Sequence, residues 1–219
     1  MDKSDIINKT IKFVKSTLEG AEGGHDWFHI DRVWKNAKLI AQTENADLFI
    51  IELGALLHDI ADAKFHNGDE SVGPKKARDF LESENVKEEY IQHIENIIQN
   101  ISFKNSLDPG TKKFHSIELD IIQDADRLDA IGAIGIARAF NYGGFKNREI
   151  FNPDIKPSLQ LSKAEYKKSK APTINHFYEK LLLLKDKMNT NSGYKIAKRR
   201  HKFMEEYLDQ FFKETNAEE

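Results

Sequence analysis

An all-α fold is predicted for this chain of 219 residues, because apolar residues recur at helical spacing in nearly every informative segment. No segment alternates convincingly at the period of two that a half-buried strand requires, and no internal repeat is visible. The chain is long enough to bury a core without covalent cross-links. We therefore expect one compact multi-helix domain over residues 1–219.

The individual helices follow from stripes of apolar residues. In the first, Ile30, Val33, Ala37 and Ile40 share one face. The second is apolar on most sides and is expected at the centre. The expected helices cover residues 26–43, 46–60, 86–101, 116–141, 174–188 and 194–213. The helices within 174–213 should pack on a core formed by residues 20–141.

Two features interrupt this pattern. Gly132 and Gly135, inside the segment 116–141, suit close helix packing or a kink. Residues 142–172 carry several further breakers, namely Gly143, Gly144, Pro153, Pro157 and Pro172. A loop of this length within a compact domain is usually functional or mobile, so we interpret it as a lid or flap and not as a domain boundary.

Composition excludes several classes of function. The chain has no Cys, which excludes disulfides, thiolate nucleophiles and Cys-bound zinc and leaves His, Asp and Glu as metal ligands. A net charge of -3 with both signs mixed gives no global field for nucleic acid. Charges scattered through the first 20 residues exclude a secretion signal or membrane span there, so we expect a cytoplasmic protein without a membrane partner.

Polar residues end the central helix in the stretch LLHDIADAKFH. His58 and Asp59 lie about a hundred degrees apart around that helix and could hold one ion from two directions. Such a pair is more often a hydrogen-bonded structural pair. Further along the chain, Asp124, Asp126 and Asp129 are set among apolar residues of another helix, where a compensating cation is expected.

The order of these motifs resembles the HD-domain superfamily of metal-dependent phosphohydrolases. The resemblance rests on His29 in HIDRV, His58 and Asp59 in LLHDIAD, and Asp126 in DADRLDAIGAIGIAR. The segments ISF, FYEKLLLLKDKMNT and IAKRRHKFM also look like the bacterial branch that includes nucleotide pyrophosphohydrolases. The motifs are specific for the superfamily and much less specific for the substrate.

The resemblance implies that His29, His58, Asp59 and Asp126 bind one divalent metal ion. We expect manganese first, with magnesium, iron, cobalt, nickel and zinc as alternatives, because this mixed set of nitrogen and oxygen ligands does not select one metal. A bound ion lowers the pKa of its water and polarises the phosphoryl group.

Two further residues are predicted to be catalytic. Asp62 resembles the acid that relatives use for proton transfer, and Lys64 would neutralise phosphate charge. The alternatives are a hydrogen bond near a helix end for Asp62 and a favourable interaction with the helix dipole for Lys64.

Other histidines have structural and functional interpretations. Asp26, beside His25, is expected to cap the helix or orient His29 and not to bind metal. His66, His93 and His115 are the candidates for a second metal site. His93 and His115 do not fit the pattern expected for two metals, so we favour a single ion.

Residues that could contact the phosphates of a substrate are His93, Arg127, Lys180, Lys185 and Arg199. For the charged residues of this set, pairing or ordinary surface solvation is the more common role. The run KRRHK could bind nucleic acid, but no aromatic residues are interleaved with it, so we do not expect nucleic acid as the main partner.

The leading hypothesis is a metal-dependent phosphohydrolase that converts nucleoside triphosphates to monophosphates and pyrophosphate. The same ligands would serve a phosphomonoesterase or a cyclic-nucleotide phosphodiesterase. A metal or nucleotide sensor without turnover is a further alternative. The sequence leaves open the native metal, the substrate, the bond that is cleaved and whether the protein is a homodimer.

Overall fold

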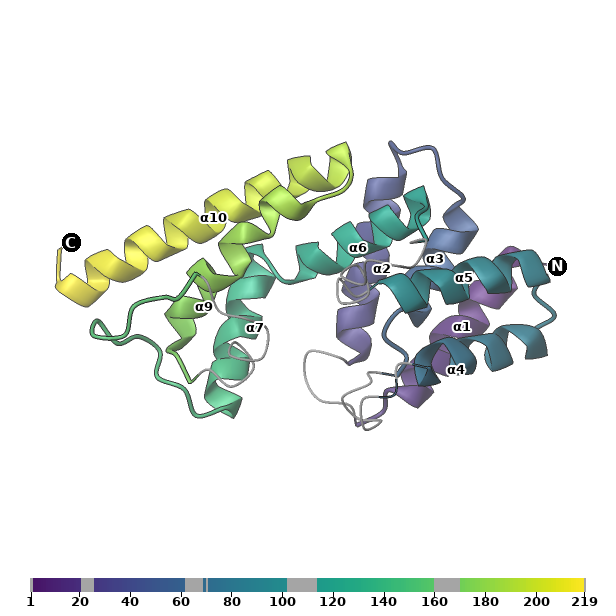
Figure 1. Ribbon diagram of the computed structural model, residues 1–219, viewed down its shortest axis with the longest axis horizontal. Coiled ribbons are helices and arrows are strands. Elements are labelled where there is room, and N and C mark those ends of the chain that lie inside the picture. Colours follow the sequence, from purple (N-terminus) through teal and green to yellow (C-terminus); the bar gives the residue numbers. More distant parts are fainter. Residues whose placement is uncertain are drawn as a thin grey trace. The chain divides into compact units, whose positions relative to one another are not determined.

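The computed structural model describes residues 2–20, 26–61, 69, 71–101, 114–159 and 170–218. Every regular element in these ranges is a helix, which confirms the all-α prediction (Figure 1). The chain divides into two compact units, residues 1–126 and 127–219. The single domain over residues 1–219 stays a prediction.

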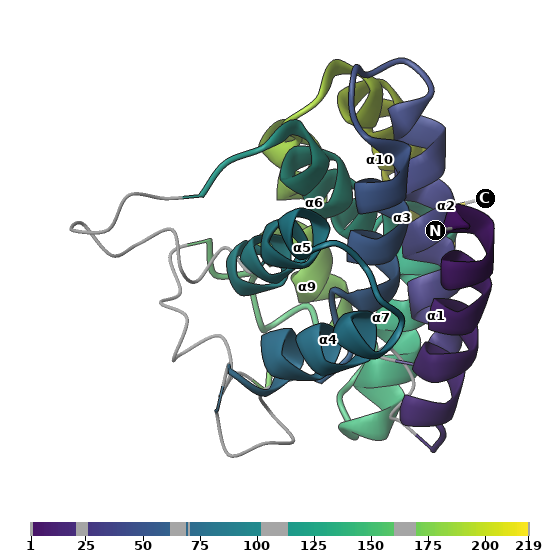
Figure 2. The same cartoon turned by 90° about the vertical axis from the view of Figure 1, so that its right-hand side faces the viewer.

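The first unit is built around one apolar helix. Its helices are α1 (Lys3–Thr17), α2 (Trp27–Ala41), α3 (Leu48–Leu57), α4 (Val72–Ser83), α5 (Glu88–Asn100) and most of α6 (Ile117–Asp129). α3 packs against α1, α2 and α5, and α4 packs against α5. Figure 2 shows α3 between α5 on one side and α1 and α2 on the other. A helix that is apolar on most sides requires this central position, as predicted.

A glycine allows α3 and α6 to approach closely. A Cβ atom on Gly54 would lie 2.6 Å from Cδ1 of Ile122, closer than ordinary van der Waals contact. Gly54 is therefore a position at which a side chain of α6 reaches the backbone of α3. This approach places the ends of both helices, as described for the site below.

The second unit has an aromatic core. Its elements are α7 (Gly132–Phe145), α9 (Thr173–Glu179), the 3₁₀ turns η3 (Leu181–Leu183) and η4 (Lys185–Lys187), and α10 (Asn191–Asn216). Phe177 stacks on Tyr207 with ring centroids 6.0 Å apart, and Phe140 contacts both rings. α10 packs against α7 and η4, and α7 packs against α9.

The segment expected as one helix over 116–141 is two helices. α6 ends at Asp129, Ile131 is extended, and α7 begins at Gly132 with a φ of +76°. Only glycine adopts this left-handed conformation without strain. A Cβ atom on Gly135 would collide with the backbone carbonyl of Ala130, so the second glycine permits the tight turn. The kink considered for these glycines is thus a complete break.

The segment expected as one helix over 174–188 is also interrupted. α9 ends at Glu179, because Lys180 leaves the helical region with φ −144° and ψ −57°. The chain continues in two 3₁₀ turns, in which residues three apart lie on one side. Leu181 and Leu184 have this spacing and are both buried. The sequence analysis also missed α1 and α4.

Part of the long segment 142–172 is helical, because α7 continues through Phe145. Residues that follow α7 form hydrogen bonds with the start of α9. The backbone N–H groups of Thr173 and Ile174 donate to the carbonyls of Glu149 and Ile150 at 2.9 and 3.0 Å. A lid or flap stays a prediction, because residues 160–169 lie outside the described ranges.

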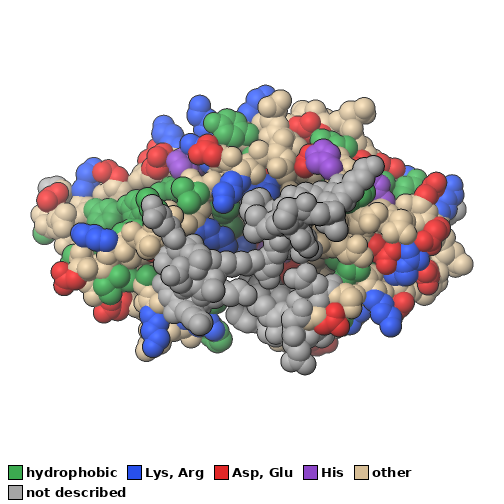
Figure 3. All heavy atoms as spheres, in the orientation of Figure 1, with side chains coloured by type: hydrophobic (Ala, Val, Ile, Leu, Met, Phe, Trp, Pro, Cys, Tyr) green, Lys and Arg blue, Asp and Glu red, His purple; other side chains and the backbone are tan. Residues whose placement is uncertain are grey.

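The visible surface carries both signs of charge. On the face shown in Figure 3, Lys and Arg side chains are interspersed with Asp and Glu over both units. Within the described ranges, no helix has both the length and the hydropathy needed to cross a membrane.

Candidate metal centre

Three of the predicted metal ligands meet in the first unit. His29, His58 and Asp126 each offer a ligand atom, and these atoms all lie within 4.8 Å of one another. Nε2 of His29 is 3.6 Å from Oδ1 of Asp126. The imidazole rings of His29 and His58 are arranged edge to face, with centroids 5.5 Å apart. Three segments that are distant in sequence therefore converge on one point.

His29 is held by the start of its helix. Asp26 is the N-cap of α2, and its Oδ1 accepts the backbone N–H of His29 at 2.9 Å. A capping carboxylate satisfies one of the N–H groups that the first turn leaves unpaired. The capping role expected of Asp26 is therefore present, and it fixes the turn from which His29 projects.

His58 is oriented by the backbone of α3. Its Nδ1 lies 2.8 Å from the carbonyl oxygen of Ala55. A carbonyl oxygen can only accept, so Nδ1 carries the proton and Nε2 keeps its lone pair. A hydrogen bond of this kind on the opposite ring nitrogen is typical of metal-binding histidines, because it fixes the tautomer and the ring orientation.

The close approach of α3 and α6 brings His58 and Asp126 together. His58 lies four residues after Gly54, and Asp126 lies four residues after Ile122. Four residues are about one helical turn, so both side chains emerge one turn beyond the point of contact. The contact between Gly54 and Ile122 thus lies close in sequence to both His58 and Asp126.

The donor set fits a divalent metal ion. Donors about 2.0–2.2 Å from an ion lie roughly 3–4.3 Å from one another, which is close to the observed separations. His29 and His58 are 3% and 7% exposed, whereas the Asp126 side chain is 45% exposed. The two nitrogens thus approach an ion from the buried side, and the carboxylate side is open to a substrate.

The fourth predicted metal ligand does not join the group. Asp59 is half-buried, and its carboxylate is not among the three converging side chains. Its role as a ligand stays a prediction. Asp62 and Lys64, predicted to be catalytic, lie outside the described residues, as do His25 and His66.

His93 lies near the other end of α6. Its Nε2 is 3.1 Å from Oγ of Ser116 and 3.4 Å from Oε2 of Glu118. Glu118 precedes Asp126 by eight residues, roughly 12 Å along the helix. Glu118 is buried and also accepts the backbone N–H of Asp47 at 3.1 Å. Glu118 was not predicted as a partner of His93 or of Asp47. The available signal was its position among the apolar residues at the start of α6.

His115 does not join the converging group. Its side chain is 76% exposed, and its Nε2 pairs with Asp120 at 2.9 Å. Within the described ranges, only His29 and His58 among the histidines contribute to a group of potential metal ligands. The number of ions stays a prediction, because His66 lies outside the described ranges.

The predicted phosphate-binding residues of the second unit have varied surroundings. Arg127 is half-buried, and Lys180 and Arg199 are exposed. Nζ of Lys185 is 3.7 Å from the carboxylate of Asp186. Their contacts with a substrate stay predictions.

An ion pair with a buried carboxylate lies three residues after Asp126, at the end of α6. Asp129 is 1% exposed, and its Oδ2 is 2.6 Å from Nη1 of Arg138. Nη1 of Arg200 donates to the carbonyl of Leu128 at 2.5 Å, and burial lowers the pKa of the Arg200 guanidinium. The sequence analysis missed both arginines as partners of this helix end. An arginine within the otherwise apolar run GIARAF was the available signal.

Comparisons with known proteins agree with this geometry. Residues 27–131 match the family model described as HD domain. The chain is 38% identical over 204 residues to protein YpgQ of Bacillus subtilis, covering 92% of this chain and 90% of that protein.

Solved structures show the same fold. The crystal structure of an HD-superfamily hydrolase from Bacillus thuringiensis has a TM-score of 0.80 and 47% identity, covering 98% of this chain and 99% of the other. YpgQ in complex with ADP has a TM-score of 0.73 and 34% identity, covering 98% and 97%. His29, His58 and Asp126 all lie within the matched residues 27–131.

Proposed function

The chain belongs to the HD-domain superfamily of metal-dependent phosphohydrolases, and we propose that it hydrolyses nucleoside triphosphates to nucleoside monophosphates and pyrophosphate. The observation that supports a metal-dependent reaction is the convergence of His29, His58 and Asp126. The support for a nucleotide is that the relative YpgQ has been crystallised with ADP.

The side chains of the site have separate proposed roles. His29 and His58 present imidazole nitrogens from the buried side, and Asp126 presents a carboxylate at the open side. Asp59 is proposed as the fourth ligand. A bound divalent ion, which we propose is manganese, supplies an activated water and polarises the phosphoryl oxygen. The orientation of His58 by the Ala55 carbonyl removes the need to select a tautomer when an ion binds.

Acid–base chemistry and phosphate binding are assigned to other residues. We propose that Asp62 accepts and donates protons at the water and the leaving oxygen, a role worth about 10²- to 10⁴-fold in rate. Lys64 is proposed to neutralise charge on the phosphate under attack. Arg127, Lys180, Lys185, Arg199 and His93 are proposed to contact the rest of the substrate.

Pyrophosphate release tests this proposal against its alternatives. Full-length protein with Mn²⁺ is incubated with a panel of nucleotides, and pyrophosphate and inorganic phosphate are measured in parallel. We expect pyrophosphate in equal amount to the monophosphate. Release of inorganic phosphate alone would identify a phosphomonoesterase, and activity only on cyclic nucleotides would identify a phosphodiesterase.

Variants connect the activity to the site. His58→Ala and Asp126→Asn are expected to lose both bound metal, measured by elemental analysis, and hydrolysis. His115→Ala is the matched control, because this histidine is exposed and outside the group. Full activity in His58→Ala would contradict the proposal.

The sensor alternative has its own test. Asp62→Asn is expected to retain nucleotide binding and to lose turnover, because a proton carrier is needed only for reaction. Nucleotide binding without turnover in the unmodified protein would favour a sensor.

A further inference from the structure

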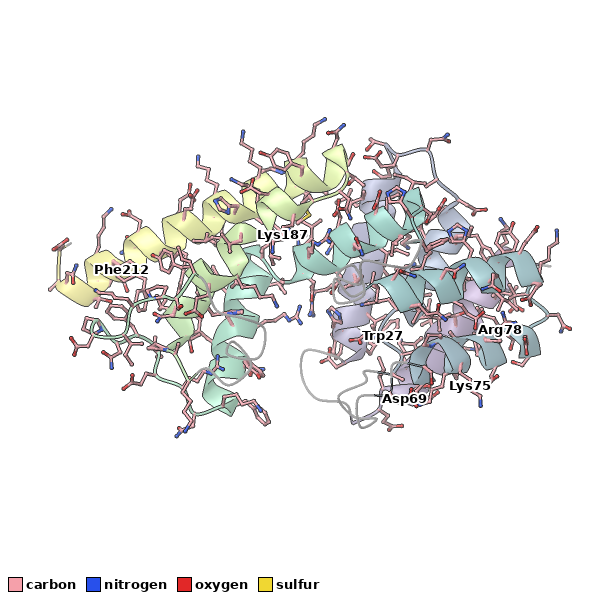
Figure 4. All side chains as sticks on the ribbon, in the orientation of Figure 1. Trp27, Asp69, Lys75, Arg78, Lys187 and Phe212 are labelled. Atoms are coloured by element: carbon pink, nitrogen blue, oxygen red, sulfur yellow. The ribbon has the colours of Figure 1, made fainter. Side chains whose placement is uncertain are left out.

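The second unit contains a cavity that is separate from the residues of the metal centre. It has a volume of about 320 Å³ and lies between residues 151–157, α9 and the C-terminal part of α10. Phe151, Tyr178 and Phe212 supply aromatic surfaces, and Ile174 and two prolines complete the apolar lining. Phe212 projects from α10 near this loop (Figure 4). Its volume and mostly apolar lining are those of a small-molecule site.

The walls of the cavity are held in place without a ligand. The ring of Phe151 packs edge to face against Phe211 and Phe212, with centroids 6.0 and 5.4 Å apart. Ser158 donates its backbone N–H to Oε1 of Glu179 at 3.0 Å, which ties the loop to α9. A preformed cavity avoids the cost of ordering a loop when a ligand binds.

A buried amide supplies an acceptor at the cavity. Asn175 is 1% exposed and lines the cavity, and its Nδ2 donates to the carbonyl of Ile155 at 3.0 Å. Since that carbonyl can only accept, the NH₂ group of Asn175 points toward it. The other polar atom of the amide, Oδ1, is left to accept a hydrogen bond. Within the described ranges, no residue donates to this oxygen. A ligand N–H could therefore donate to this oxygen.

Two further groups define the charge that a ligand would carry. Among the described residues that line the cavity, Lys156 alone carries a charge, which is positive, and this residue is exposed. Burial raises the pKa of the Tyr178 phenol, so its hydroxyl remains protonated and can donate. Both groups favour a ligand with an anionic or acceptor-rich end.

We propose that this cavity binds a small heteroaromatic anion of the nucleoside monophosphate class. The aromatic side chains offer surfaces for stacking a flat ring, Asn175 accepts from a ring or exocyclic N–H, and Lys156 faces the anion. The proposed hydrolysis yields a product of the same class, which would make the cavity a site for product control. The proposal rests on the cavity itself and not on the reaction.

Nuclear magnetic resonance of the full-length His58→Ala variant tests the proposal, because its predicted metal ligand is disabled. AMP is the probe. We expect saturable shifts of the Asn175 side-chain amide and of residues 151–157, with a Kd below about 1 mM. Adenosine should shift the same residues more weakly, and inorganic phosphate should give no saturable shift.

Two substitutions locate the site. Ile155→Trp places a large ring at a position that is 41% exposed, and it should abolish the AMP shifts. Lys156→Glu should weaken AMP binding about tenfold and leave adenosine binding unchanged, because only the anion contact is lost. Lys195→Glu, an exposed lysine of α10, is the control for a general effect of charge and should retain wild-type binding.

Three results would overturn the proposal. The first is no saturable shift at the cavity up to several millimolar AMP. The second is an equal shift with inorganic phosphate alone, which would indicate a simple anion contact. The third is unchanged AMP binding in a folded Lys156→Glu variant. Loss of hydrolysis in His58→Ala leaves this test unaffected, so failure of the proposed function and failure of this proposal can be told apart.

Discussion

Removal of the Arg138 side chain is expected to destabilise the second unit through the carboxylate that it leaves behind. Asp129 is 1% exposed, and Nη1 of Arg138 contacts both its Oδ2 at 2.6 Å and its backbone carbonyl at 3.2 Å. Breaking a fully buried pair on one side costs about 3–5 kcal/mol. The Arg138 side chain is 30% exposed, which lets water replace part of the contact, so we expect about 2–3 kcal/mol for Arg138→Ala.

The assay is urea and thermal unfolding followed by circular dichroism. For a chain of this length, a loss of about 2–3 kcal/mol corresponds to a decrease in Tm of roughly 5–10 °C. Arg199→Ala is the matched control, because Arg199 is exposed on α10, and it should stay within about 0.5 kcal/mol of the wild type.

A double mutant separates the ion pair from loss of packing. Arg138→Ala combined with Asp129→Asn should be more stable than Arg138→Ala alone, because the amide removes a buried negative charge that has lost its contact with Arg138. A stability of Arg138→Ala within about 0.5 kcal/mol of the wild type would refute the reasoning. The reasoning would also fail if the two substitutions destabilised the protein additively.

Three further outcomes are expected. Gly135→Ala should destabilise the protein by about 2–3 kcal/mol in urea unfolding, because the added Cβ meets the backbone carbonyl of Ala130. Gly144→Ala is the control and should be nearly neutral, because its Cβ would have no atom within 4 Å. Equal effects of the two substitutions would contradict this reasoning. Burial, aided by positive neighbours, lowers the pKa of His176 from 6.5 to about 4, so its neutral form is favoured in the folded state. Stability should therefore fall as the pH decreases from about 6.5 to about 4, by at most roughly 3 kcal/mol, and His176→Gln should flatten that part of the curve of unfolding free energy against pH. Mn²⁺ at a hundred times its Kd should stabilise the protein by about 2.7 kcal/mol and raise its Tm, and a melting curve of His58→Ala that responds equally to Mn²⁺ would argue against the site.

The position of a helix in the fold was predictable where its apolar pattern is unambiguous. α3 is apolar on most sides, and its central position followed from that pattern alone. The break between α6 and α7 was harder to predict, because apolar residues continue through it from Leu128 to Ile131 at helical spacing. α1 was missed although its buried face, which includes Ile6 and Val14, has the period of a helix.

The candidate site was predictable in its residues and not in its geometry. The motif order identified His29, His58 and Asp126, but their convergence depends on contacts between distant segments, such as that between Gly54 and Ile122, which no local pattern reveals. Consecutive residues differ in direction by about a hundred degrees around a helix, so the presence of His58 in the group did not ensure that of Asp59. Arg138 and Arg200 could not be assigned, because their partners lie at a helix end that the sequence analysis did not recognise.

The acceptor that orients His58 has an evolutionary consequence. It is a main-chain oxygen, so every amino acid at position 55 provides it, and mutation of that codon alone cannot delete it. The identity of residue 55 is then constrained by the space inside α3, where Ala55 is fully buried, and not by the chemistry of the neighbouring histidine. Homologues are free to exchange small apolar residues there while inheriting the same imidazole tautomer.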